Sequence, residues 1–122
     1  MFDHIGFSVA DFAASRAFYV AALAPLGIGV EMDFGDTVGL GRKGNPQLWF
    51  GAGGKPAGRL HLAFTAKNRA EVDAFYEAAL KAGAKDNGGP GLRPQYHPNY
   101  YGAFVIDLNN HNIEAVCHSP EA

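Results

Sequence analysis

Two histidines and one glutamate in this sequence have the chemical types and the positions that a metal site needs. His4 and His61 stand at equivalent places near the start of two short alternating segments, and Glu114 interrupts an otherwise apolar segment from Ile113 to Cys117. A buried carboxylate must be paired, bound to a ligand or costly. Each histidine alone is more typical of a hydrogen-bonded core residue, but two imidazoles with one carboxylate suit Fe(II), Mn(II), Ni(II) or Zn(II) and leave coordination positions open for substrate. We therefore predict a divalent-metal site at His4, His61 and Glu114.

The two histidines belong to an internal repeat with a spacing of 57 residues. Residues 4–24 align with residues 61–81 without a gap, and 9 of the 21 positions are identical. The identical pairs are His4/His61, Phe7/Phe64, Ala13/Ala70, Ala17/Ala74, Phe18/Phe75, Tyr19/Tyr76, Ala21/Ala78, Ala22/Ala79 and Leu23/Leu80. A long period with only two copies indicates two fused modules rather than a solenoid. A pseudo-twofold axis between the modules would bring both imidazoles toward one shared site.

Each copy of the repeat predicts a strand followed by a helix. Residues 4–9 and 60–65 alternate in character, which predicts strands whose histidine-bearing face is lined by small residues and is open. Asp11 and Asn68 stand where helix N-caps belong, and apolar residues at helical spacing follow both. Glycines end both helices, with Gly27 after Pro25 in the first copy and Gly83 in the second.

Strand-like runs complete each module. They occupy residues 29–34, 37–41 and 47–51 in the first copy and 100–108 and 113–118 in the second, with turns at residues 44–46 and 109–111. Residues 86–99 are rich in glycine and proline and predict a loop that can act as a lid. The predicted fold class is α+β, with two β-α-β-β-β modules at residues 1–57 and 58–122 that form one domain.

The composition is that of one folded domain and excludes several partners. Hydrophobic residues make up 48% and charged residues 18% of the 122 residues, which excludes a disordered chain. The formal net charge of −2 gives no reason to expect nucleic acid or an anionic membrane. The longest uncharged stretch, residues 17–30, is shorter than the roughly 20 residues that span a bilayer. A single cysteine, Cys117, and a start without signal-peptide features favour a reducing, cytoplasmic location.

The sequence resembles the vicinal oxygen chelate superfamily, which includes glyoxalase I, bleomycin resistance proteins, extradiol dioxygenases and fosfomycin resistance transferases. The resemblance covers nearly the whole chain and rests on DHIGFSVAD with ASRAFY, LHLAF with VDAFYEAAL, and the closing YYGAFVIDLNNHNIEAVCH. It implies a glyoxalase-like fold, in which paired modules form a cupped mixed sheet around a divalent metal and the helices cover the outer face. It also places the metal ligands at His4, His61 and Glu114.

One position departs from the pattern of glyoxalase I, which has a fourth ligand at the end of its first module. Aligning Asn45 with Asn110 puts Trp49 at that position. Because an indole neither ligates a metal nor accepts a proton, Trp49 argues against glyoxalase I activity. Gln47, two residues away on the same face, can supply a neutral oxygen ligand instead, as in some epimerase-like members. We assign both Gln47 and Trp49 to the substrate-binding face.

Several further side chains are candidates for contact with substrate. Tyr100 and Tyr101 lie on opposite faces of one strand, and we choose Tyr101 as an acid or hydrogen-bond donor to a substrate oxygen, next to Glu114 as the second catalytic candidate. Arg93 and Tyr96, in the glycine-rich loop, can close over a substrate together with the neighbouring histidine.

The remaining histidines and the cysteine are not expected to take part in chemistry. His111 lies in a turn and His118 near the end of the chain, so both are predicted to be exposed. Cys117 falls on the strand face opposite Glu114 and is predicted to be buried and unreactive.

The leading functional prediction is a metal enzyme that chelates two neighbouring oxygens of a small-molecule substrate, with the metal as Lewis acid. Ring-cleaving dioxygenase fits the two-histidine, one-glutamate set best, although many such enzymes have four modules. Thiol transfer to fosfomycin fits the length, but it needs a cationic cluster and no Lys or Arg follows Glu114. A lyase or isomerase is the third reaction class.

The alternative is a non-enzymatic protein that binds a drug such as bleomycin in the grooves of a dimer. Such proteins lack the metal ligands that this sequence has, which favours the enzyme. Family members complete their sites by pairing chains, and for this reason we expect a homodimer.

Overall fold

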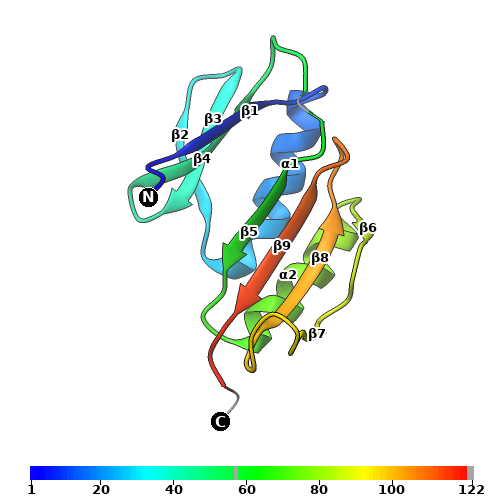
Figure 1. The fold of residues 1–122 in the computed structure, drawn as a ribbon. Helices are drawn as coiled ribbons and strands as arrows, with labels where there is room; N and C mark the ends of the chain where they lie inside the picture. The colour runs from blue at the N-terminus through cyan, green and yellow to red at the C-terminus, as the bar shows by residue number, and fades with distance from the viewer. Residues whose placement is uncertain (57, 121–122) are drawn as a thin grey trace.

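The computed structural model describes residues 1–56 and 58–120 and has the predicted α+β architecture of two β-α-β-β-β modules (Figure 1). The first module contains β1 (Ile5–Ser8), α1 (Phe12–Leu23), the short 3-10 helix η1 (Ala24–Leu26), β2 (Gly29–Asp33), β3 (Thr37–Arg42) and β4 (Asn45–Gly51). The second contains β5 (His61–Thr65), α2 (Arg69–Lys81), β6 (Lys85–Asp86), β7 (Gly91–Leu92), β8 (Tyr101–Ile106) and β9 (Asn112–Cys117).

The two modules have the same sheet topology. Strand order is β1-β4-β3-β2 in the first sheet and β5-β9-β8-β6 in the second, and β7 also pairs with β8. In each sheet the first strand is parallel to the last, and the other pairs are antiparallel. Among the described residues β1 pairs only with β4 and β5 only with β9, so the two sheets do not share a hydrogen-bonded strand.

The predicted loop at residues 86–99 is partly a broken edge strand, which corrects the prediction. β6 and β7 both pair with β8, and between them Gly88 has a φ of 135°, a conformation that only glycine adopts without strain. The edge of β8 offers backbone groups that need partners, and the chain satisfies them in two short pieces because glycine and proline interrupt a continuous strand.

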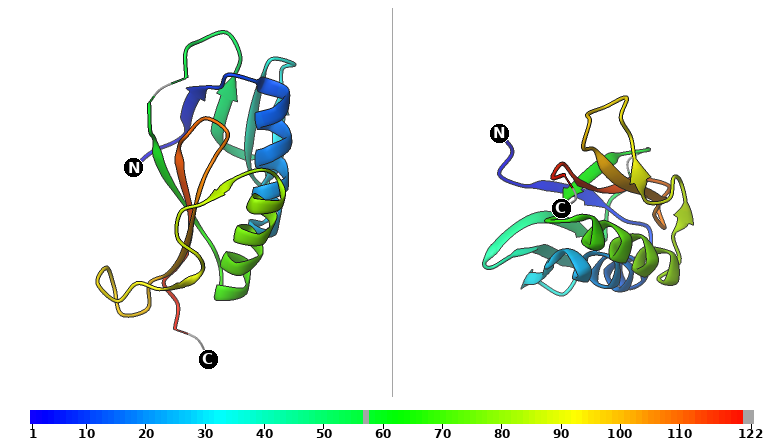
Figure 2. Two further views of the ribbon diagram at one scale, coloured as in Figure 1. Left: turned by 90° about the vertical axis from the view of Figure 1, so that its right-hand side faces the viewer. Right: turned by 90° about the horizontal axis from the view of Figure 1, so that it is seen from below.

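Both helices begin at the predicted caps. The Asp11 side chain accepts a hydrogen bond from the Ala14 amide at 3.0 Å, and the Asn68 side chain accepts one from the Glu71 amide at 2.9 Å. Gly83 follows α2 with a φ of 111°, which confirms the predicted end of that helix. The helices lie side by side on one face of the strand layer (Figure 2).

The predicted turn at residues 44–46 lies slightly earlier in the chain. Lys43 and Gly44 have φ values of 42° and 79°, and Asn45 and Pro46 already belong to β4. Pro46 fits there because it lies at the start of β4, where a missing backbone N–H costs little.

Strand alternation divides each sheet into a core face and a face that the helices do not cover, called the open face below. Core residues from both modules form one cluster, which includes Leu40 and Phe50 from the first module and Val105 and Ile113 from the second. Tyr19, on α1, is completely buried against this cluster. No helix in the described part of the chain is long and apolar enough to cross a membrane.

Candidate functional site

The open face of the second module carries a buried carboxylate between two hydrogen-bonding partners. Glu114 on β9 is only 1% exposed. Its Oε1 lies 3.0 Å from Nε2 of His61, and its Oε2 accepts a hydrogen bond from the Tyr100 hydroxyl. The His61 side chain is 53% exposed, so the His61 end of this hydrogen-bonded series faces solvent.

Alternation along β9 explains why Glu114 lies on the open face. Ile113, Ala115 and Cys117 point into the core, which confirms that Cys117 is buried, and Glu114 points the other way. A glycine makes room for the carboxylate, because a Cβ at Gly102 would lie 3.2 Å from Glu114 Oε2. The sheet therefore reserves space for this side chain and supplies polar partners for it, as burial of a carboxylate requires.

Tyr100 keeps its proton in this arrangement. Burial and the neighbouring Glu114 carboxylate both raise the pKa of the Tyr100 phenol above its ordinary value. The hydroxyl is therefore a donor to Glu114 and holds one carboxylate oxygen in place while His61 contacts the other.

The structure places the Tyr101 hydroxyl, the predicted donor, away from Glu114 and places the Tyr100 hydroxyl against it. Tyr101 lies on the helix-covered side of β8, where its hydroxyl donates to Asp73 on α2 at 2.7 Å and the Arg69 guanidinium lies 5.1 Å from its ring centroid. The signal that identifies Tyr100 is the strand register. Phe104 pairs with Glu114 across β8 and β9, so even-numbered residues of both strands share a face.

His4 does not join the His61–Glu114 pair within one chain. The His4 side chain is 59% exposed, and its Nδ1 lies 2.7 Å from Asp3 Oδ1. Among the described residues no group of three or more His, Cys, Asp or Glu side chains could hold a metal ion. His61 and Glu114 do have the chemistry of metal ligands, an imidazole nitrogen beside a carboxylate oxygen, but they are two ligands rather than three.

A cavity of about 390 Å³ lies between the two modules and reaches both histidines. Its lining includes His4 and Gln47 from the first module and His61 from the second. Gln47 thus lies at the same cavity as both histidines, where we predicted a substrate contact. Glu114 lies behind His61 and is not part of the cavity wall.

Strand register supports the alignment of Trp49 with Glu114. Gly6 pairs with Trp49 in the first module, and Ala63, which is 57 residues after Gly6, pairs with Glu114 in the second. The indole Nε1 donates to the Pro46 carbonyl at 3.0 Å, so its one hydrogen bond is used within β4. Trp49 also stacks on Phe34, with ring centroids 6.0 Å apart and planes 14° apart.

The loop residues Arg93 and Tyr96 lie near the same end of the second sheet. The Arg93 guanidinium donates to the Gly89 carbonyl at 2.8 Å and lies 5.4 Å from the Phe104 ring centroid. Tyr96 is 63% exposed, and its ring packs edge-on to Tyr100 with centroids 5.1 Å apart. The loop therefore approaches Glu114 through Tyr100, and the substrate contacts of Arg93 and Tyr96 stay predictions.

His111 is fully buried, which corrects the prediction that this turn residue is exposed. Its Nδ1 accepts a hydrogen bond from the Leu60 amide at 3.0 Å, and its ring packs edge-on to Phe7. Asp107 closes the turn by accepting the His111 amide at 2.8 Å and the Tyr19 hydroxyl. The His111 side chain is buried because the first module packs against it through Phe7, which sequence spacing within the second module does not reveal. His118 is exposed as predicted.

Comparisons with known proteins agree with this architecture. A family model described as the Glyoxalase/Bleomycin resistance protein/Dioxygenase superfamily matches residues 1–114. A comparison with curated proteins finds no match. The crystal structure of a glyoxalase/bleomycin resistance protein from Albidiferax ferrireducens is 29% identical to this chain, with a TM-score of 0.79 over 98% of this chain and 99% of that one.

Two other solved structures share the fold at lower identity. A putative glyoxalase from Bacillus halodurans is 24% identical, with a TM-score of 0.72 over 96% of this chain and 95% of that one. A glyoxalase/bleomycin resistance protein/dioxygenase family enzyme from Burkholderia phytofirmans is 18% identical, with a TM-score of 0.73 over 96% and 98% of the two chains. Since the family match spans the first module and reaches Glu114 in the last strand of the second, the chain belongs to the Glyoxalase/Bleomycin resistance protein/Dioxygenase superfamily.

Proposed function

We propose that this protein is a divalent-metal enzyme that binds a small substrate through two neighbouring oxygen atoms. The observation that carries the proposal is the buried Glu114 carboxylate with Oε1 3.0 Å from His61 Nε2, on the open face. A carboxylate oxygen beside an imidazole nitrogen has the chemistry of a metal-ligand pair, and the half-exposed His61 is the member that solvent reaches. When bound, Fe(II), Mn(II), Ni(II) or Zn(II) would act as a Lewis acid toward the substrate oxygens.

The third ligand in this proposal is His4 of a second copy of the chain. His4 and His61 are 59% and 53% exposed, so both are accessible to a partner. A homodimer that brings His4 of one copy to the His61–Glu114 pair of the other completes a two-histidine, one-carboxylate set. Tyr100 is the positioning residue in the same proposal, because its hydroxyl fixes the carboxylate that must face the metal.

The position of Trp49 supports a reaction other than that of glyoxalase I. Isomerisation of a hemithioacetal needs a base that moves a proton between adjacent carbons, and base catalysis is worth about 10²–10⁴ in rate. Trp49 supplies no base, and its N–H is already bonded to the Pro46 carbonyl. We expect activity first in a screen of catechols, with fosfomycin–thiol transfer and 2-oxoaldehyde–thiol adducts as the comparison reactions.

Metal analysis and mixing of variants test this proposal. Protein dialysed against each metal in turn is expected to bind it stoichiometrically, and His61→Ala and Glu114→Ala are expected to lose it, whereas the control His118→Ala keeps it. Mixed dimers of His4→Ala and Glu114→Ala chains should regain one intact site per dimer, because the two defects fall in the same site. Metal retained by both His61→Ala and Glu114→Ala would refute the ligand pair. Sedimentation of a monomer only, at micromolar concentration, would refute the shared site.

A second candidate function is the binding, without chemistry, of a drug that can stack a flat aromatic group on this surface. The observation that favours it is Phe34, which is 64% exposed and stacked on Trp49. Trp49 is the single tryptophan of the chain, so its fluorescence reports directly on this surface. Quenching by bleomycin in metal-free protein, together with no turnover in the screen, would favour the binding protein over the enzyme.

A further inference from the structure

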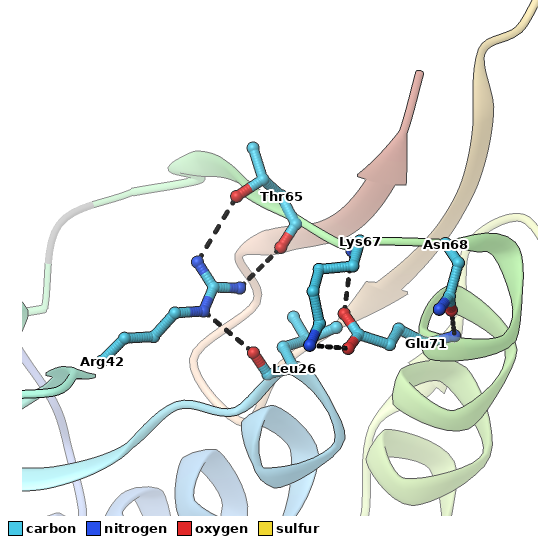
Figure 3. A network of polar contacts seen from close by, with 6 residues as sticks. All are labelled: Leu26, Arg42, Thr65, Lys67, Asn68 and Glu71. Carbon is cyan, nitrogen blue, oxygen red and sulfur yellow. Dashed lines mark hydrogen bonds and ion pairs between the residues drawn. The ribbon is translucent and has the colours of Figure 1, made fainter. Parts of the chain in front are cut away.

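The cavity between the modules contains a fixed positive charge that the proposed metal chemistry does not use. Arg42, at the end of β3, lines this cavity of about 390 Å³. Its Nε donates to the Leu26 carbonyl at 2.9 Å, and its Nη2 donates to the Thr65 carbonyl at 2.7 Å (Figure 3). The guanidinium therefore bridges the first module and β5, and two backbone carbonyls hold it in one orientation.

The charge of Arg42 has no carboxylate partner within ion-pair distance in the described part of the chain. Its acceptors are two carbonyls and, at 3.5 Å, the Thr65 hydroxyl, all of which are neutral. Arg16, by contrast, pairs with Asp33 at 2.8 Å. Asp3, the acidic residue that lines the cavity, is bonded to His4 instead.

Arg42 has hydrogen-bonding capacity left for a ligand. A guanidinium has five N–H groups, and three of them are used by Leu26 and Thr65. The remaining two can form the charge-assisted hydrogen bonds that arginine makes with carboxylates and phosphates. Because the guanidinium is already held in place, a ligand would not need to immobilise it, which lowers the entropic cost of binding.

The rest of the cavity wall favours a ligand with an apolar body. Leu62 and Phe64 contribute apolar surface, and Gln47 contributes a neutral amide. A volume of about 390 Å³ falls in the range of small-molecule sites, which are mostly apolar with a few placed polar groups. We infer that this cavity binds a small organic anion, a carboxylate or a phosphate ester, through the Arg42 guanidinium.

Arg42 and the two histidines line the same cavity, but the Arg42 guanidinium is held at a different point of it. Thr65, which contacts Arg42, is four residues from His61 along β5, or about 13 Å at the rise of an extended strand. Binding of an anion at Arg42 therefore needs no metal. It can be measured in protein treated with a chelator, so this inference stays testable if the metal proposal fails. The metal proposal likewise stays testable if no anion binds at Arg42.

Calorimetric titration of metal-free protein with matched probes tests the inference. The probes are 4-phenylbutyrate, phenyl phosphate and the neutral 4-phenylbutanamide. Since hydrogen bonds to a charged group are stronger than those to a neutral one, at least one anion should bind about tenfold or more tightly than the amide. Which anion binds more tightly distinguishes a carboxylate site from a phosphate site.

Three variants separate ligand binding from the structural bridge that Arg42 also makes. Arg42→Gln should bring the anion-to-amide affinity ratio to about one, and Arg42→Lys should keep part of it because the charge remains. Arg16→Gln makes the same change in net charge elsewhere and should leave the ratio unchanged. If Arg42→Gln does not fold, the anion-to-amide affinity ratios of Arg42→Lys and of the wild type still test the inference. Equal affinity of anions and amide for the wild type, binding of neither, or an unchanged ratio in a folded Arg42→Gln would overturn the inference.

Discussion

The two modules share a backbone plan but place different chemistry at the same point of it. In the second module Glu114 lies on the open face between His61 and Tyr100. In the first module Trp49 takes the equivalent place, by register, and stacks on Phe34. One copy of the repeat thus carries a polar site and the other an aromatic surface. The repeat conserves strand order and pairing, which depend on backbone geometry, and leaves the open-face side chains free to differ.

The residues that pair with Trp49 and Glu114 on the adjacent strands also differ between the modules. Opposite Trp49 stands Gly39, and a Cβ there would lie 2.8 Å from the indole ring. Opposite Glu114 stands Phe104. The large side chain therefore comes from β4 in the first module and from β8 in the second. In the first module the indole occupies the space that a side chain at position 39 would need.

The turns that lead into the last strand of each module differ in the same way. Aligning them through Asn45 and Asn110 places Arg42 at the position of Asp107. Arg42 reaches Thr65 in the second module, and Asp107 reaches Tyr19 in the first. Both turns therefore connect the modules, one through an exposed cation and the other through a buried anion.

The largest expected effect comes from the buried connection. Asp107→Ala removes the acceptor of the Asn109 and His111 amides and of the Tyr19 hydroxyl, and should lower the free energy of unfolding by about 3–4 kcal/mol. Urea denaturation followed by circular dichroism measures this. Arg42→Ala is the matched change in the other turn and should cost only about 1 kcal/mol, because its site is exposed. Equal losses for the two variants would show that the turns are energetically alike.

The second prediction compares the two adjacent tyrosines. Tyr100→Phe leaves one oxygen of the buried Glu114 without its donor and should cost about 2 kcal/mol in unfolding free energy. Tyr101→Phe removes an exposed bond to Asp73 and should cost less than about 1 kcal/mol. The same pair should differ in metal affinity, with only Tyr100→Phe weakening it by about 10-fold. Identical metal affinities would remove Tyr100 from the proposed site.

A third prediction concerns the pairing of the small Gly39 with the large Trp49 ring. Gly39→Ala pushes the Trp49 ring away from its place over the strand and should cost about 1–2 kcal/mol. In a Trp49→Ala background the same change should be neutral or stabilising, so a double-mutant cycle should give a coupling of about 1 kcal/mol or more. A red shift of Trp49 fluorescence in Gly39→Ala is the independent readout. If the stability losses of Gly39→Ala and Trp49→Ala simply add in the double variant, the Trp49 indole is not held in place by the space at Gly39.

The smallest effect is a loss of stability at alkaline pH. Burial, followed by the Asp107 carboxylate, raises the pKa of Tyr19, and burial with Glu114 raises the pKa of Tyr100. Unfolded tyrosine ionises near pH 10, so the stabilisation is complete below about pH 10 and is lost as pH rises above it. Unfolding midpoints should fall between about pH 9 and about pH 11, and the fall should be shallower in Tyr100→Phe. A pH-independent midpoint would contradict the assigned partners.

The sequence alone determined the modules and the faces of their strands. Helix caps at Asp11 and Asn68, the alternation around His61 and the place of Glu114 on β9 all follow from local spacing, and the structure agrees with each. Local spacing is sufficient there because a strand alternates with period two and a helix with period 3.6, whatever the rest of the chain does. The 57-residue repeat added the equivalence of Trp49 and Glu114, which register supports.

Only the tertiary structure decided which side chains meet. The choice of Tyr100 over Tyr101 depends on register between β8 and β9, and the burial of His111 depends on the first module lying against the turn. His4 stays apart from the His61–Glu114 pair for the same kind of reason. These outcomes are set by contacts between residues distant in sequence, and the packing of one module on the other has no local pattern that a single sequence displays.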